Sequence, residues 1–71
     1  MDTTNFQITE IEEAVLGALM IEKKAFPQVA QTLRPEMFYR EKEQTLYAVL
    51  ENMHRNNEPI NILTVKEALQ K

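Results

Sequence analysis

An apolar run at residues 13–20 most constrains this chain, because it contains the only glycine of 71 residues. The apolar residues recur at the spacing of a helix, so the run predicts a helix with Gly17 in its interior. A glycine there costs roughly 1 kcal/mol relative to alanine. We therefore expect compensation by close packing: a neighbouring helix or aromatic ring should approach the backbone at Gly17.

The composition excludes several kinds of active site. A Walker-type phosphate-binding loop or a dinucleotide fingerprint needs two or three glycines within a few residues. The chain also lacks cysteine, which excludes a thiolate nucleophile, a disulfide and a cysteine zinc site, and it has a single histidine, His54. We predict no catalytic, cofactor-binding or metal-binding residues, so this chain alone should not be an enzyme.

Charge and hydropathy bear on partners and location. Eleven acidic and eight basic residues give a net charge of −3, which disfavours attraction to duplex DNA or to anionic lipid. No apolar run approaches the roughly 18 residues of a membrane span, and the N-terminus lacks the basic region of a signal peptide. We expect a cytoplasmic domain with no membrane contact and no direct binding to duplex DNA.

The first half of the chain predicts two helices. Thr9 and Glu12 have the spacing of a capping box, which places the start of the first helix at Thr9 and its end near residues 22–24. Pro27 suits the first position of a short second helix. Pro35 then ends that segment, because its ring moves the preceding residue out of helical dihedrals.

A third helix follows a short turn. The turn at residues 36–39 should place Phe38 in the core, and the helix should begin near Arg40 or Glu41. Polar residues and a proline at 56–59 end it. We expect this helix to be the longest of the predicted elements.

Asn61 is the predicted N-cap of a fourth helix that continues to Lys71. Ile60 and Val65 around it have the spacing of a hydrophobic staple. The expected fold is therefore all-α, a small orthogonal bundle of about four helices plus a short turn. Its predicted core consists of Ile11, Val15, Leu19, Phe26, Leu33, Phe38, Leu46, Leu50, Met53, Val65 and Leu69.

We expect residues 1–8 to form an N-terminal tail and residues 9–71 to form the helical domain. The last helix has neither a glycine stop nor a polar tail after it. That ending is typical of a domain that has been truncated at its C-terminal side.

Four segments carry a resemblance to a known family. In order, they are residues 13–20, Phe38-Tyr39, Leu46-Tyr47 and residues 58–65. Together they closely resemble the N-terminal domain of DnaB-type replicative DNA helicases, from about residue 8 to residue 69. Members of that family usually carry a histidine at the position of Glu43 and an aspartate at the position of Asn61. The asparagine keeps the capping chemistry of the aspartate.

The resemblance implies a non-catalytic collar domain of a hexameric, ATP-dependent 5′–3′ DNA helicase. Such domains support ring assembly and dock partners, so the implied partners are other helicase subunits, primase and a helicase loader. ATP and magnesium would be bound by motor domains further along a full-length protein, and no cofactor by this fragment. A free-standing helical adaptor that binds a partner protein is the alternative. A helix-turn-helix DNA binder fits less well, because the net charge has the wrong sign.

Some apolar groups are not required by the predicted core. They are Tyr39, Tyr47 and Ile62, set near Arg40 and Lys42. Tyrosine beside arginine is a common composition for a binding hot spot. We therefore predict that contacts to a neighbouring subunit or to primase use the start of the third helix and its flank.

Overall fold

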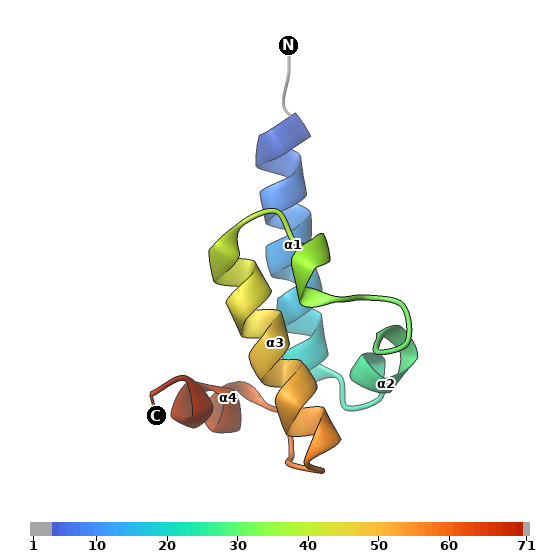
Figure 1. The fold of residues 1–71 in the computed structure, drawn as a ribbon, viewed down its shortest axis with the longest axis vertical. Coiled ribbons are helices and arrows are strands. Elements are labelled where there is room, and N and C mark those ends of the chain that lie inside the picture. The colour runs from blue at the N-terminus through green and yellow to red at the C-terminus, as the bar shows by residue number, and fades with distance from the viewer. Residues whose placement is uncertain (1–3, 71) are drawn as a thin grey trace.

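Two long helices, α1 (Thr4–Ile21) and α3 (Glu41–Arg55), pack against each other and organise the fold (Figure 1). The computed structural model describes residues 4–70, with side chains from residue 8 onward. In the view of Figure 1, helix α2 (Ala25–Val29) and the 3₁₀ turn η1 (Pro35–Met37) lie on one side of this pair. Helix α4 (Ile62–Leu69) lies on the other side. The described residues contain only helices, turns and loops, so the all-α prediction is confirmed.

Helix α1 begins five residues earlier than predicted. Residues 4–8 were expected in the tail but are helical, whereas residues 1–3 and Lys71 lie outside the described part of the chain. Thr9 is consequently inside the helix and cannot be its N-cap. Glu12, its expected capping partner, instead accepts a hydrogen bond from the backbone N–H of Tyr39.

The prolines act largely as predicted. Pro27 is the third residue of α2 rather than the first, still within the first turn, where backbone N–H groups have no helical partner. Arg34 has extended dihedrals (φ −129°, ψ 153°) before Pro35, as the proline rule requires. Phe38 follows η1 and is buried, which confirms the predicted turn.

The starts of α3 and α4 match the sequence prediction. Helix α4 ends at Leu69 and does not continue to the predicted end at Lys71, and α3, with 15 residues, is shorter than the 18-residue α1 and is not the longest helix. Helix α3 begins at Glu41, and the chain leaves it through Asn57, whose positive φ of 58° is a conformation that asparagine tolerates. Asn61 caps α4 in a reciprocal box with Thr64. The N–H of Thr64 donates to Oδ1 of Asn61, and the N–H of Asn61 donates to Oγ1 of Thr64, both at 3.0 Å.

Most of the residues predicted for the core are buried or partly buried, and the prediction was wrong for four. Ile11 and Leu69 were expected inside but are exposed, whereas Leu16 and Tyr47 are buried. The side of α1 that meets the core runs through Leu16 and Leu19, so Ile11 lies on another face of that helix. The fully buried apolar set is Leu16, Leu19, Phe26, Phe38, Tyr47, Leu50, Met53 and Val65.

Tyr47 is the centre of this core and not part of a partner surface. Its side chain is 0% exposed, with ring centroids 5.5 Å from Phe26 and 5.1 Å from Phe38. Its hydroxyl donates to the backbone carbonyl of Leu33 at 3.2 Å. Burial raises the pKa of the phenol, which keeps the donating proton in place. The prediction that Tyr47 contacts a partner is therefore wrong.

Gly17 does not sit under a neighbouring helix. A Cβ built at this position meets no heavy atom within 4 Å, and its φ is not positive. The expected close approach at Gly17 is therefore absent within this chain, because the core face of α1 passes through Leu16 and Leu19 instead.

Gly17→Ala should stabilise the chain by about 0.5–1 kcal/mol, because the glycine has a cost in helix propensity and nothing obstructs a methyl group. Urea unfolding followed by far-UV circular dichroism measures this change. Ala18→Gly, one residue further on the same helix, should lower the free energy of unfolding by a similar amount. A loss of stability in Gly17→Ala would contradict the open surroundings of Gly17.

Tyr47→Phe should lower the free energy of unfolding by about 1 kcal/mol, because it removes the hydrogen bond to Leu33 while keeping the ring contacts. Thermal unfolding would measure the change. Tyr39→Phe, which removes an exposed hydroxyl, is the matched control and should have no effect. Equal stabilities for the two variants would show that the bond to Leu33 contributes nothing.

Candidate protein interface

Two glutamates of α1 hold the segment that precedes α3. The backbone N–H of Tyr39 donates to both carboxylate oxygens of Glu12, at 3.1 and 3.0 Å. Nη2 of Arg40 lies 3.2 Å from Oε2 of Glu13. Tyr39 and Arg40 are thus fixed in position relative to α1, although they lie in a loop.

Arg40 also pairs with Glu43 of α3 in a bidentate arrangement. Nε of Arg40 donates to Oε1 at 2.9 Å, and Nη2 donates to Oε2 at 2.8 Å. Glu43 is only 2% exposed, and a buried carboxylate is costly unless it is paired. The hydrogen bonds from Arg40 lower the pKa of Glu43, and Glu43 raises the pKa of Arg40. The position at which the family resemblance implies a histidine is therefore occupied here by the acidic half of an ion pair.

The extended backbone around Tyr39 explains why its side chain points outward. The flanking residues Phe38 and Arg40 both have extended dihedrals, and successive side chains of an extended segment point to opposite sides. Because Phe38 points into the core, Tyr39 points away from it and is 57% exposed. The result is an exposed aromatic side chain on a backbone held by Glu12.

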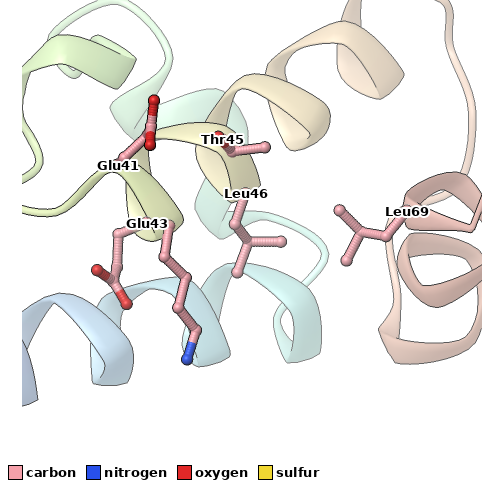
Figure 2. A pocket seen from close by; sticks show the side chains of 6 residues that line it. Glu41, Glu43, Thr45, Leu46 and Leu69 are labelled. Atoms are coloured by element: carbon pink, nitrogen blue, oxygen red, sulfur yellow. The ribbon is translucent and has the colours of Figure 1, made fainter.

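A groove of about 480 Å³ separates the start of α3 from the end of α4. Figure 2 shows Leu46 of α3 and Leu69 of α4 pointing toward one another across it. The lining residues are Glu41, Lys42, Glu43, Thr45, Leu46 and Leu69. Its base is thus apolar and its α3 side carries charges of both signs.

The structure brings together only part of the predicted surface. Tyr39 and Arg40 are adjacent and exposed, and Lys42 is exposed beside the groove. Ile62 is exposed on α4, and of the predicted surface residues only Lys42 lines the groove.

Sequence reasoning also missed the three glutamates that hold Arg40 and Tyr39. The spacing of Arg40 and Glu43, three residues apart at the start of a helix, was an available signal for their pairing. No sequence pattern connects either residue to Glu12 or Glu13, because those contacts join segments 27 residues apart.

Gly17 and the acidic side chains are the described residues that bear on phosphate or metal binding. Gly17 lies inside α1, so it cannot belong to a phosphate-binding loop. Among the described side chains, no three histidine, aspartate or glutamate residues are grouped to hold a metal ion. Within residues 4–70, no helix has the length and apolar character required to cross a membrane.

Arg40→Ala should raise the pH at which the chain unfolds in acid. The folded-state pKa of Glu43 is lowered, so the ion pair stabilises the fold above the ordinary carboxylate value of 4.5 and is lost as the pH falls through the folded pKa. Removing Arg40 leaves Glu43 buried without its partner and raises its pKa. Circular dichroism from pH 7 to pH 2, with carboxyl NMR of Glu43, tests this.

Two further variants separate the ion pair from a general charge effect. Glu43→Gln, which keeps the shape of the side chain, should remove the acid-dependent part of this stability. Lys66→Ala removes an exposed cation of α4 and should leave the acid midpoint unchanged. An unchanged midpoint in Arg40→Ala would mean that the pair does not stabilise the fold.

Comparison with known proteins places this fold in a family. Residues 4–71 match the model of the DnaB-like helicase N terminal domain. Replicative DNA helicase DnaB of Rhodothermus marinus is 37% identical over 65 residues, which cover 92% of this chain and 7% of that protein. Replicative DNA helicase DnaB of Haemophilus influenzae is 31% identical over 62 residues, covering 87% of this chain and 13% of the relative.

A third relative, replicative DNA helicase DnaC of Bacillus subtilis, is 33% identical over 63 residues, covering 89% of this chain and 14% of that helicase. The chain therefore spans a small part of the length of the curated relatives it matches. No solved structure matches it. Because the family model covers all but the first three residues, the chain belongs to the DnaB-like helicase N-terminal domain family.

Proposed function

We propose that this chain is the non-catalytic N-terminal domain of a hexameric replicative DNA helicase, and that it supports ring assembly and the docking of primase or a loader. Membership of the family and the names of the relatives support this proposal. The chain matches only 7–14% of those relatives. The ATP and magnesium sites of a 5′–3′ helicase would lie in the rest of a longer protein, which acts in the cytoplasm.

The observation that carries the docking role is the exposed and fixed pair Tyr39–Arg40. A partner that binds a side chain already held in place loses less conformational freedom than one that must order a mobile loop. The two hydrogen bonds to Glu12 provide this order for the backbone of Tyr39. Tyrosine and arginine are also enriched among the residues that dominate binding energy. We therefore assign primase or loader docking to the surface around Tyr39.

The second candidate function is a free-standing adaptor that binds a partner protein without any helicase attached. It would use the same surface, so the two proposals differ only in the coding sequence beyond residue 71. A downstream G-x-x-x-x-G-K-[ST] segment supports the helicase, because that segment binds the phosphates of ATP. A natural stop codon at that point supports the adaptor.

Tyr39→Ala in the full-length protein should weaken binding of its cognate primase about tenfold or more, the loss expected for a hot-spot residue. Isothermal calorimetry measures primase affinity, and native mass spectrometry measures ring mass. Arg40 stays unchanged in this experiment, because its removal would leave Glu43 buried without a partner. Helical content should be unaffected, because Tyr39 contributes only its backbone to the hydrogen bonds with Glu12.

Tyr39→Phe keeps the aromatic ring and should retain most of the affinity. Ile62→Ala removes an exposed apolar group of α4 that was predicted for the same surface, and its primase affinity shows whether α4 also contributes. Unchanged primase affinity in Tyr39→Ala, with the fold intact, would remove this surface from the proposal.

A further inference from the structure

Methionine is the only sulfur-containing residue type in this chain, which has four methionines and no cysteine. An oxidant that attacks sulfur must therefore reach a thioether. Among the side chains that the structure describes, Met53 is 2% exposed and belongs to the core, and Met20 packs against that core. Met37, in contrast, is 58% exposed. Met37 is thus the accessible thioether of the described part of the chain.

Met37 lies next to the proposed docking surface. It is the last residue of η1, and the buried Phe38 separates it from the exposed Tyr39. Its side chain lines a notch of about 130 Å³ between α1 and the segment that follows α2. The other lining residues are Glu12, Val15, Leu33 and Phe38. Glu12 also accepts from the N–H of Tyr39, so the notch adjoins the backbone that holds Tyr39 in place.

The surroundings of Met37 suit an apolar side chain and not a polar one. Three of the other residues of the notch are apolar, and the fourth is the carboxylate of Glu12. Oxidation of a methionine to the sulfoxide adds a polar oxygen that accepts hydrogen bonds and donates none. In the free chain, water can satisfy this oxygen, because Met37 is exposed. A bound partner would remove that water, and a polar atom buried without a hydrogen bond is costly.

The backbone of η1 does not depend on the side chain of Met37. The N–H of Met37 donates to the carbonyl of Arg34 at 3.0 Å, and the N–H of Phe38 donates to the carbonyl of Pro35 at 3.1 Å. Phe38 also anchors the segment in the core. We therefore expect the helices and the position of Tyr39 to survive oxidation, which would change only the surface that a partner covers.

We propose that Met37 is an oxidation site, and that its oxidation by a peroxide weakens the docking of a partner at Tyr39. Hydrogen peroxide transfers one oxygen atom to Sδ of Met37: the O–O bond breaks, an S–O bond forms and water leaves. The sulfur gives up two electrons, which reduce the peroxide. A thiol-dependent sulfoxide reductase reverses the change, so the site acts as a switch. The effect on docking rests on the proposed function, whereas the selective oxidation of Met37 does not.

Peroxide treatment followed by peptide mapping tests the site itself. The chain is exposed to hydrogen peroxide, samples are quenched with free methionine at intervals, and digested peptides are weighed by mass spectrometry. Met37 should be oxidised about tenfold faster than Met53, the buried reference in the same molecule, because oxidation follows exposure of the sulfur. Far-UV circular dichroism should show the same helix content before and after treatment.

The affinity of the full-length protein for its cognate primase provides the second measurement. Oxidation should weaken binding about tenfold, as expected when one polar atom is buried without a hydrogen bond. A methionine sulfoxide reductase with a dithiol should restore the affinity. Met37→Leu keeps an apolar side chain without sulfur, so peroxide should leave its affinity unchanged. Met37→Gln is polar at the same position and should bind weakly without any peroxide.

Three results would overturn the inference: equal oxidation rates of Met37 and Met53, loss of helix content on oxidation, or an equal loss of primase affinity in the parent and in Met37→Leu. The last result would place the sensitive residue elsewhere in the longer protein. A Tyr39-dependent affinity that peroxide leaves unchanged would count against the switch alone. An affinity that Tyr39→Ala leaves unchanged would instead remove the docking surface from the proposed function, and the effect of Met37 on docking would fall with it.

Discussion

The packing of the Tyr47 ring between Phe26 and Phe38 is the interaction on which the rest of the structure depends. It joins α2, the loop after η1 and α3, and its hydroxyl fixes the carbonyl of Leu33. Once Phe38 is held in this cluster, the extended backbone leaves Tyr39 outside. The exposed tyrosine of the proposed docking surface is thus positioned by the buried tyrosine of the core.

Side chains satisfy the polar backbone of the connection between α2 and α3, which has only one 3₁₀ turn of its own. Glu12 accepts from the N–H of Tyr39, and the Nε2 amide of Gln44 donates to the carbonyl of Phe38 at 2.8 Å. Backbone groups near a core need partners of this kind, since each unpaired group costs about as much as a lost hydrogen bond. The same acidic side of α1 supplies Glu13 to Arg40. Helix α1 therefore orders the proposed docking surface through Glu12 and Glu13, while the exposed aromatic group itself belongs to the loop.

Local signals in the sequence were sufficient to predict where most helices begin. They were insufficient to predict which side of each helix is buried. The cap at Asn61, the break at Pro35 and the start of α3 each depend on the chemistry of a few neighbouring residues, and all three are confirmed. Buried Glu43, Tyr47 and Leu50 are spaced four and three apart, so they also form a helical stripe. That stripe includes an acidic residue, and only the tertiary contact with Arg40 explains how a glutamate can belong to it. The prediction for Gly17 failed as well. The glycine suggested close packing against its backbone, but no heavy atom of this chain lies within 4 Å of a Cβ built there.

The small size of the chain helps to explain why several large apolar side chains remain exposed to solvent. A domain of this length buries a smaller fraction of its surface than a larger one does, so apolar side chains remain exposed on α1 and α4. Several of these exposed apolar side chains share a helix face or a groove with another apolar side chain. Ile11 and Ile21 share one face of α1, and Leu69 faces Leu46 across the groove (Figure 2). The two faces of helix α1 therefore differ in what a substitution does. Substitutions at the buried Leu16 or Leu19 act on folding, whereas the exposed Ala14 and Ala18 can be changed without disturbing the core.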